Sequence, residues 1–389
     1  MLPEIGIDLM KRSLAMIDAQ WPDAAQACME VPLEYYRSEE QFRRDRALFE
    51  RSPLAVLASS EIRNPFDYHV RIAMGRSLLL TRDEEGAAHV FLNYCRHRGA
   101  EPADGCGNAR GFNCPYHAWR YDIRGRLITM PLRDRYAGMD LSRYGLVELP
   151  SQERHGLIWT VLTPGAPIDV AGHLGPIDAE LAAYGFDRMT YHNSLVRERL
   201  GANWKAVTEG LVEALHVPYV HKATFNLNPQ AVSLDLALND AIGPHVRYCL
   251  PFFTRADVPR IAGRPEREWV PEDHLGLVWW ISPGNLIARD LYGYIFADLM
   301  PGSRPDESFM RYGWMTPVPT APEGMLSPED MAVRAARAVR EDVPVWEGCG
   351  HGLTLGGHDA AFIGRNEKAV QLVHESLARQ TGYSGLRYC

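Results

Sequence analysis

The residues most able to do chemistry gather in two short stretches that lie about a hundred residues apart. In the first stretch, a Cys-x-His pair precedes a Cys-x2-His pair, and in the second, one glutamate precedes two histidines. Cysteine thiolates and neutral imidazoles are the ligands that iron and zinc prefer in proteins. Both stretches therefore predict metal sites. The first contains Cys95, His97, Cys114 and His117, and the second contains Glu213, His216 and His221.

The first stretch suits an iron–sulfur cluster better than a zinc ion. Two loops that each supply one cysteine and one histidine can give Cys95 and Cys114 to one iron, and His97 and His117 to the other. This is the ligand set of a Rieske [2Fe–2S] cluster, in which two histidines replace two cysteines on one iron. A zinc site usually pairs like ligands within each loop, so zinc is the weaker alternative.

The second stretch supplies two histidines and a carboxylate, the donors of a mononuclear non-haem iron site. His216 and His221 are five residues apart, which turns them roughly 140° away from each other on a regular helix. They can share one metal only where the helix is interrupted, and Pro218 between them lacks the N–H that a helix needs. Glu213 lies three residues before His216, so it either binds the metal or holds His216 by a hydrogen bond.

Composition narrows the class of protein. The chain has 389 residues and a formal net charge of −8, so a nucleic-acid partner is not expected. Seven scattered cysteines do not form a disulfide framework, and two of them in metal-ligand spacing favour a reducing compartment. Neither a signal peptide nor an apolar run long enough to span a membrane is evident. We expect a soluble cytoplasmic protein.

The pattern of apolar residues and turn signals predicts an α+β fold in three parts. An N-terminal helical segment (1–37) packs on the last domain, an all-β domain (38–163) carries the first stretch, and a mixed domain (164–389) carries the second. Ser38 is the expected N-cap of the second helix. Helices are expected over 5–17, 38–49, 178–184, 204–217, 328–339 and 366–380, and strands over 70–74, 77–81, 88–94, 156–162, 276–282, 286–288 and 292–299.

Nearly the whole chain resembles the large (alpha) subunit of Rieske non-haem iron aromatic-ring-hydroxylating oxygenases. The resemblance implies an all-β Rieske domain followed by a helix-grip (START-like) catalytic domain built on a twisted antiparallel sheet. Two small departures are Ala118, where the family usually has glycine, and Gly350, where glutamine often follows an acidic pair. The motifs that carry the resemblance are Cys95-Arg96-His97-Arg98-Gly99, Cys114-Pro115-Tyr116-His117-Ala118-Trp119, and Asn203-Trp204-Lys205 followed by Glu213, His216 and His221.

The resemblance also implies roles for further residues. The third iron ligand comes from the acidic pair Glu341-Asp342; we choose Asp342, with Glu341 and then Asp359 as alternatives. Glu213 takes a different role and links His216 to the Rieske histidine of a neighbouring subunit, which corresponds to His117 here. Asn203 is counted with Glu213 in the catalytic machinery. Electron transfer between subunits implies a head-to-tail homotrimer, a ring closed by heterologous contacts, and a β subunit remains an alternative.

The expected activity is that of the terminal oxygenase of a multicomponent system. No dinucleotide-binding motif is present in the chain, so a partner flavin reductase, with or without a ferredoxin, would use NAD(P)H. The expected substrates are O2 and a small aromatic or amine, which undergoes mono- or dihydroxylation or oxidative dealkylation. A quaternary-ammonium monooxygenase of the same family is the alternative, and an electron-transfer protein without oxygenase chemistry is the alternative from another class. Candidate pocket residues are Phe225, Leu227, Trp279, Leu286 and Trp346, with Trp280 and Tyr292 as further candidates.

Overall fold

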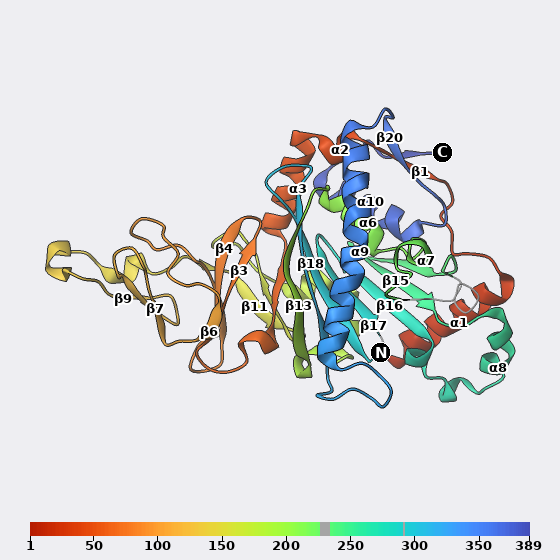
Figure 1. Ribbon diagram of the computed structural model, residues 1–389, viewed down its shortest axis with the longest axis horizontal. Coiled ribbons are helices and arrows are strands. Elements are labelled where there is room, and N and C mark those ends of the chain that lie inside the picture. The colour runs from red at the N-terminus through yellow and green to blue at the C-terminus, as the bar shows by residue number, and fades with distance from the viewer. Residues whose placement is uncertain (226–233, 291) are drawn as a thin grey trace. The chain divides into compact units, whose positions relative to one another are not determined.

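The computed structural model describes residues 1–225, 234–290 and 292–389, with the side chains of 193–197 outside the described part. The chain divides into two compact units (Figure 1). In the described part of the chain, no helix combines the length and the apolar character that crossing a membrane requires. Unit 1 comprises Met1–Leu48, Leu174–Gly185 and Thr190–Cys389, and unit 2 comprises Phe49–His173 and Phe186–Met189.

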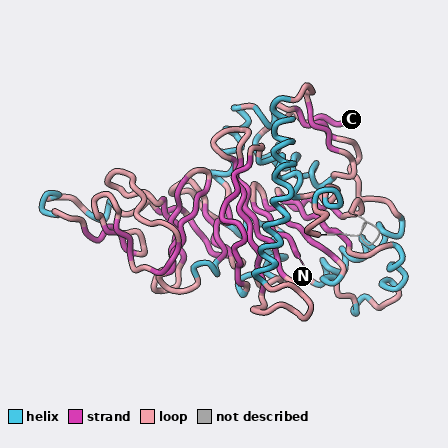
Figure 2. The backbone as a smooth tube through the Cα atoms, in the orientation of Figure 1, coloured by secondary structure: helices cyan, strands magenta, loops and turns pink. Residues whose placement is uncertain are grey.

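The strands of unit 2 are short and antiparallel, and loops connect them (Figure 2). A five-stranded sheet has the order β10-β5-β4-β3-β6, and two three-stranded sheets have the orders β11-β12-β2 and β7-β8-β9. The strands expected over 70–74, 77–81, 88–94 and 156–162 correspond to β3, β4, β5 and β12. The bounds are β2 (Leu54–Ala58), β3 (Asp67–Ala73), β4 (Arg76–Arg82), β5 (Ala88–Leu92), β6 (Cys106–Asn108), β7 (Gly111–Asn113), β8 (Arg120–Asp122), β9 (Leu127–Thr129), β10 (Glu148–Leu149), β11 (Ser151–Arg154) and β12 (Leu157–Thr160).

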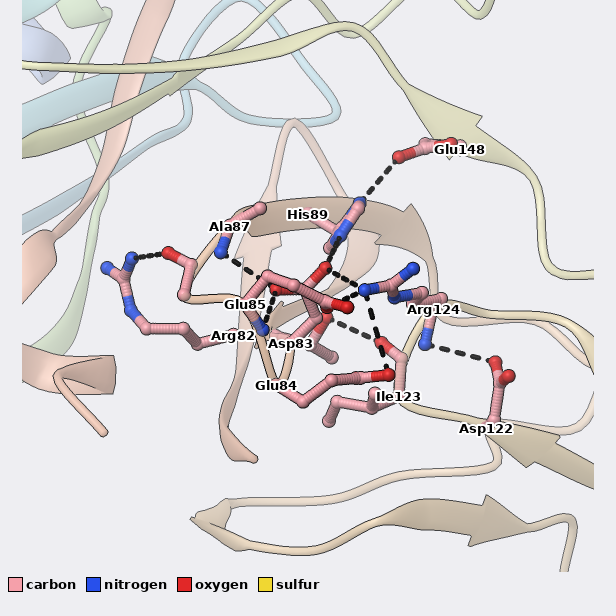
Figure 3. Close-up of polar contacts among 12 residues, drawn as sticks. Arg82, Asp83, Glu84, Glu85, Ala87, His89, Asp122, Ile123, Arg124 and Glu148 are labelled. Carbon is pink, nitrogen blue, oxygen red and sulfur yellow. Dashed lines mark hydrogen bonds and ion pairs between the residues drawn. The ribbon is translucent and has the colours of Figure 1, made fainter. Parts of the chain in front are cut away.

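The turn between β4 and β5 is held by a charged cluster around the buried carboxylate of Asp83 (Figure 3). This carboxylate accepts the backbone N–H groups of Glu85 and Ala87 at 3.1 and 2.8 Å. Arg124, from the turn between β8 and β9, reaches the same carboxylate at 3.0 Å. His89 lies between Asp83 at 3.1 Å and Glu148 of β10 at 2.9 Å. One histidine therefore links the β4–β5 hairpin to the strand β10.

This arrangement predicts a pH-dependent stability of unit 2. Partial burial opposes protonation of His89, but its hydrogen bonds to Glu148 and Asp83 outweigh burial and hold its pKa above the ordinary value of 6.5. A raised folded-state pKa gives stability that is complete below pH 6.5 and is lost as pH rises through the folded-state pKa. We expect unit 2 to lose about 1 kcal/mol over this interval. The His89→Gln variant should show no such change when unfolding is compared at pH 6 and pH 8.5.

Unit 1 is built on a seven-stranded antiparallel sheet of order β13-β19-β18-β17-β16-β15-β14. Helix α9 lies along one face of this sheet (Figure 1), where the hydroxyl of Tyr312 donates to the carbonyl of Ala336 at 2.9 Å. The expected α+β fold with a twisted antiparallel sheet is confirmed. The bounds are β13 (Thr190–Leu200), β14 (Leu238–Ile242), β15 (His245–Pro251), β16 (Leu275–Ile281), β17 (Asn285–Asp290), β18 (Gly293–Pro301) and β19 (Ser308–Thr316).

The helices of unit 1 follow most of the expected spans. Ser38 accepts the N–H of Gln41 at 3.3 Å, which confirms it as the N-cap of α3. A separate three-stranded sheet has the order β20-β1-β21. The bounds are α1 (Pro3–Ala19), α2 (Glu34–Arg37), α5 (Pro176–Ala182), α6 (Trp204–Leu211), α7 (Val217–Val220), α8 (Val258–Ala262), α9 (Pro328–Leu355), α10 (Lys368–Thr381), β1 (Met29–Pro32), β20 (Ala360–Ile363) and β21 (Arg387–Tyr388). Two helices cross the boundary between the units: α3 (Glu39–Arg51), which begins in unit 1, and α4 (Val170–Leu174), which begins in unit 2.

Helix α9 is much longer than expected. The sequence predicts a helix over 328–339, whereas α9 continues through Pro344 to Leu355. Proline removes one N–H and crowds the preceding turn, and for that reason the sequence pattern points to an earlier end. Tertiary packing overrides this local cost, because buried residues recur along the helix to Gly350. The acidic pair of the sequence analysis therefore lies within a helix.

Candidate metal centres

The two ligand loops of unit 2 have the same backbone construction. In each loop, the N–H of the cysteine donates to the carbonyl five residues later, at 2.8 Å for both Cys95 and Cys114. The N–H four residues after each cysteine donates back to the cysteine carbonyl, at 2.9 Å in both loops. The first loop connects β5 to β6 and the second connects β7 to β8. Two matching loops thus present one cysteine and one histidine each.

This construction explains the departure at Ala118. The fourth residue after each cysteine has a left-handed backbone, with φ of +81° at Gly99 and +53° at Ala118. Glycine adopts this conformation at no steric cost, whereas in other residues the Cβ atom comes too close to the backbone and raises the energy. Glycine therefore suits this position best, and the alanine here is held in the same conformation by the loop's hydrogen bonds.

The four side chains converge in a way that fits a [2Fe–2S] cluster. Cys95 and Cys114 are both buried in the hydrophobic core of unit 2. The Nδ1 atoms of His97 and His117 face each other at 3.1 Å. Burial, followed by the facing His117, lowers the pKa of His97, and a neutral imidazole is the form that binds metal. Two cysteine thiolates and two histidines are the donors that a Rieske cluster requires.

Aromatic side chains surround these donors. Trp119 stacks on His97 with the ring centroids 5.0 Å apart, and Tyr116 lies against His117 at 3.8 Å. The hydroxyl of Tyr121 lies 3.2 Å from the Cys95 sulfur and accepts the N–H of Arg96 at 3.0 Å. Burial, followed by the contact with Cys95, raises the pKa of Tyr121, so the hydroxyl keeps its proton and can donate it to the sulfur. The sequence analysis did not identify Tyr121.

This hydrogen bond is expected to raise the reduction potential of the cluster. A donor to a ligand sulfur favours the reduced state, because reduction adds negative charge to the sulfurs. Replacing Tyr121 with phenylalanine removes the donor and keeps the buried ring. We expect the potential to fall by roughly 40 mV, which corresponds to about 1 kcal/mol for one electron. Redox titration followed by visible circular dichroism measures it, and an unchanged potential would remove Tyr121 from the set of tuning residues.

The histidines of unit 1 flank a single helical turn. The sequence predicts one helix over 204–217, but α6 ends at Leu211, and the chain turns before the short helix α7. His216 is the N-cap of α7 and His221 its C-cap. The interruption therefore precedes His216, and Pro218 lies in the first turn of α7, where proline is tolerated. Glu213 stabilises the turn, because its carboxylate accepts the backbone N–H of Leu215 and that of His216.

The two histidines and Asp342 of α9 form one group of converging donors. In the described residues, one ligand atom from each of the three lies within 4.8 Å of the others. The Asp342 Oδ1 atom is 3.1 Å from Nε2 of His221 and 3.6 Å from Nε2 of His216. Asp359, the most distant alternative, forms an ion pair with Arg387 and does not belong to this group.

The outer nitrogens of both imidazoles are held by other carboxylates. His216 Nδ1 contacts Glu213, and His221 Nδ1 lies 3.0 Å from Glu341. These contacts fix each ring with its Nε2 directed at Asp342. Carboxylates that hold the far nitrogen of a ligating histidine are the usual surroundings of a metal site. The donor set fits a non-haem iron(II) centre of two histidines and one carboxylate, and the geometry favours Asp342 as ligand and Glu341 as support.

Asn203 has a structural role at the start of α6. It is the N-cap of α6, and its side-chain oxygen accepts the N–H of Lys205 at 2.9 Å. Its amide group donates to the backbone carbonyls of Tyr36 and Pro305 at 2.6 and 2.7 Å. All of these bonds are made to the backbone, so the residue anchors the start of α6. Through α6 it supports the turn that bears the histidines.

The pocket candidates divide between the two faces of the sheet. Leu286 and Trp280 are direct partners across β16 and β17, and the same row continues to Tyr312, which contacts α9. The neighbouring Trp279 must point to the opposite face, and its indole donates to Glu180 of α5 at 3.0 Å. Trp279 is therefore not a lining residue on the α9 face, which corrects the expectation.

Of the other pocket candidates, Phe225 and Trp346 lie close to the donor group, Tyr292 lies near the start of α9, where its hydroxyl donates to the carbonyl of Leu326, and Leu227 is outside the described part. The ring of Phe225 contacts that of His221 edge-on, with the centroids 5.1 Å apart. Trp346 lies one turn after Asp342 on α9 and packs against Gly210, where an added Cβ would come within 2.5 Å of the indole nitrogen. Tyr292 contacts Trp314, with the ring centroids 4.7 Å apart. Leu227 lies outside the described residues.

Comparison with known proteins identifies both units. The family model of the ring hydroxylating alpha subunit (catalytic domain) matches residues 184–382, and that of the Rieske [2Fe-2S] domain matches residues 52–148. The large oxygenase component of a naphthalene 1,2-dioxygenase system from Ralstonia sp. is 32% identical over 211 residues, which are 51% of this chain and 46% of the relative. The carnitine monooxygenase oxygenase subunit of Acinetobacter baumannii is 25% identical over 201 residues, 49% of this chain and 52% of the relative.

These alignments span about half the length of each curated relative. The fold is shared over a longer stretch: a solved quaternary ammonium Rieske monooxygenase superimposes with a TM-score of 0.75 and 19% identity, over 94% of this chain and 98% of that one. The catalytic-domain model alone covers just over half of the 389 residues. The chain therefore belongs to the family of ring-hydroxylating oxygenase alpha subunits, with a Rieske [2Fe–2S] domain and a non-haem iron catalytic domain.

Proposed function

We propose that the protein is the terminal oxygenase component of a multicomponent Rieske oxygenase, which hydroxylates or oxidatively dealkylates a small aromatic or amine substrate. The observation that carries the proposal is the group of His216, His221 and Asp342, in which both Nε2 atoms face one carboxylate oxygen. An iron bound there would supply the activation of O2 beside the substrate. An electron carrier would have no use for this second donor group.

The residues around the group have distinct tasks in the proposal. Glu213 and Glu341 orient the two imidazoles through their Nδ1 atoms. Phe225 packs against His221 and limits the access of water to that side of the group. The face of Phe225 is covered by the guanidinium of Arg334, at 5.0 Å from the ring centre. That face is thus not free for an alkylammonium.

The proposed partners are the proteins that would deliver electrons to the Rieske cluster. A ferredoxin or flavin reductase would take electrons from NAD(P)H and deliver them to unit 2. His117 borders an open cleft of about 710 Å³, so a protein partner can approach it closely. We also propose a head-to-tail homotrimer, in which Glu213 connects His216 to the neighbouring subunit, and a cytoplasmic location, where the metal-binding cysteines stay reduced.

The bridging role of Glu213 predicts a selective defect. Glutamine at this position keeps an oxygen that accepts from His216 and removes the negative charge. We expect the Glu213→Gln variant to retain both metal centres, while product formed in a single turnover of the reduced protein falls at least 10-fold. Iron analysis and the visible spectrum verify the centres, and rapid quenching measures the product. Normal single-turnover rates would exclude the bridge.

The activity itself is tested with labelled oxygen. The purified protein is supplied with a surrogate ferredoxin and reductase, NADH and a panel of small aromatics and amines. The proposal predicts oxygen uptake that depends on one of these substrates, with 18O in its product or in the released aldehyde. Electron acceptance without label in any product, on protein with both centres filled, would favour the electron carrier.

A further inference from the structure

Two cysteines far apart in the sequence face each other on neighbouring strands of unit 1. Cys28 immediately precedes β1, and Cys389 immediately follows β21. The antiparallel register pairs Met29 with Tyr388, so the next pair along these strands is Cys28 with Cys389. The two cysteines exchange both backbone hydrogen bonds, each at 3.1 Å. They therefore form a hydrogen-bonded pair directly opposite each other.

The two thiols lie on the same face of this small sheet. Side chains alternate along a strand, so Cys28 shares its face with Glu30, and Cys389 shares its face with Arg387. Glu30 and Arg387 are direct partners, and their side chains form an ion pair at 3.0 Å. Cys28 and Cys389 lie two residues further along the same two strands, so their thiols occupy the same face of the sheet as this ion pair.

The backbone spacing is compatible with a covalent bond. Directly opposite residues of a hydrogen-bonded antiparallel pair have Cα atoms about 5.5 Å apart, within the range of roughly 4.4–6.8 Å that disulfides span. Cys389 is exposed and Cys28 is partly exposed, so a small oxidant can reach them. Among the other cysteines, Cys249 is buried, whereas Cys106 and Cys349 are exposed.

We propose that Cys28 and Cys389 form a reversible disulfide that fastens β1 to β21 when the redox poise becomes more oxidising. The oxidant is a low-molecular-weight disulfide. One cysteine thiolate attacks it and releases one small thiol, and the second cysteine then displaces the other small thiol as the Cys28–Cys389 bond forms. The two cysteines lose two electrons and two protons, and the small disulfide is reduced to two thiols.

Two properties of the cysteine pair indicate a disulfide that forms and breaks with the redox conditions. Exposed disulfides have more oxidising potentials than buried structural ones, so a reducing compartment keeps this pair open until conditions change. Desolvation at the strand pair, followed by the neighbouring Cys28 and Glu30, raises the pKa of the Cys389 thiol. Closure should therefore accelerate as pH rises, because the thiolate is the attacking species.

The bond would fix the strand that leads to the metal-bearing part of unit 1. β1 runs into α2, and the hydroxyl of Tyr36 in α2 donates to Glu209 of α6 at 2.6 Å. α6 in turn leads to the turn that holds the two histidines. A bond between residues 28 and 389 closes a loop of almost the whole chain, and closing a long loop restricts the unfolded state most.

The test uses the holoprotein under anaerobic conditions, in buffers with graded ratios of reduced to oxidised glutathione. After acid quenching and alkylation, peptide mapping should show Cys28 linked to Cys389 within one molecule, reversed by dithiothreitol. The thermal unfolding midpoint of unit 1 should rise by several degrees in the oxidised form. The outcome does not depend on the proposed oxygenase activity, because neither cysteine belongs to a metal centre.

Serine variants of the two cysteines, compared with serine variants of two other exposed cysteines, test whether the disulfide causes the thermal shift. Cys28→Ser and Cys389→Ser should each abolish both the link and the redox-dependent thermal shift, whereas Cys106→Ser and Cys349→Ser should keep both. The proposal would be overturned by a pair that stays reduced or accumulates only glutathione adducts at the most oxidising ratio, by links to other cysteines or between molecules, or by a link without a thermal shift.

Discussion

Replacing Asp342 with alanine is expected to lower the iron content by about one atom per chain and to reduce turnover more than 100-fold. Asp342 is the only carboxylate in the described part of the chain whose oxygen lies within 4 Å of the Nε2 atoms of both His216 and His221. A non-haem site that loses one of three protein ligands loses most of its affinity for Fe(II). Alanine is the strongest helix former, so α9 should persist.

The neighbouring carboxylate provides the matched control. Glu341 contacts the outer nitrogen of His221, so Glu341→Gln should reduce metal affinity or activity by only about 10- to 100-fold. The Rieske spectrum should be unchanged in both variants, because the cluster ligands lie in unit 2. If Asp342→Ala kept its iron and its turnover while Glu341→Gln lost them, the ligand assignment between these two residues would be reversed.

Replacing Lys205 with methionine is expected to cost unit 1 about 3–5 kcal/mol of unfolding free energy. The Lys205 ammonium and the Asp45 carboxylate form an ion pair in which both side chains are only 1% exposed. Asp45 also accepts from the indole of Trp204 at 3.3 Å and from Gln41 at 2.8 Å. Removing the cation leaves the buried carboxylate without its counter-charge, and the desolvation cost is then no longer offset.

Two further variants separate the pair from general effects of substitution. The double variant Asp45→Asn/Lys205→Met removes both charges and should recover most of the lost stability. Lys11→Met breaks a surface pair with Glu266, in which the side chains are 51% and 54% exposed, and should cost less than about 1 kcal/mol. Urea unfolding followed by tryptophan fluorescence reports mainly unit 1, where seven of the nine tryptophans lie. A loss below 1 kcal/mol in Lys205→Met would refute the argument.

The chemistry of the two donor groups was predictable from sequence because ligand type and spacing are local properties. The paired Cys/His loops and the histidine pair around Pro218 are each contained in a short stretch. The choice of Asp342 over Glu341 was different, because adjacent residues of a helix point in different directions. Only the fold shows that Asp342 faces the Nε2 atoms while Glu341 reaches the far side of His221.

The features that the sequence does not predict depend on contacts between residues far apart in the chain. Trp279 was expected in the pocket, but strand alternation allows either face, and only pairing across the sheet shows that it points toward Glu180. The end of α9 was placed too early because local propensity at Pro344 says nothing of the packing that carries the helix onward. The role of Tyr121 depends on a contact with Cys95, 26 residues away, which no local pattern encodes.

The structure also gives the Asn203-Trp204-Lys205 motif a physical meaning. Asn203 caps α6, Trp204 is fully buried, and Lys205 pairs with Asp45. All three therefore fix the start of the helix that leads to the histidine turn. The sequence predicts that Asn203 belongs to the catalytic machinery, whereas its hydrogen bonds to the backbone give it a structural role.

The most direct test of the account is the iron and acid-labile sulfide content of the anaerobically purified protein. We predict about three iron atoms and two sulfides per chain, with two irons in the Rieske cluster and one bound by His216, His221 and Asp342. Two irons and two sulfides, with no third iron bound after Fe(II) is added, would contradict the oxygenase and leave an electron carrier.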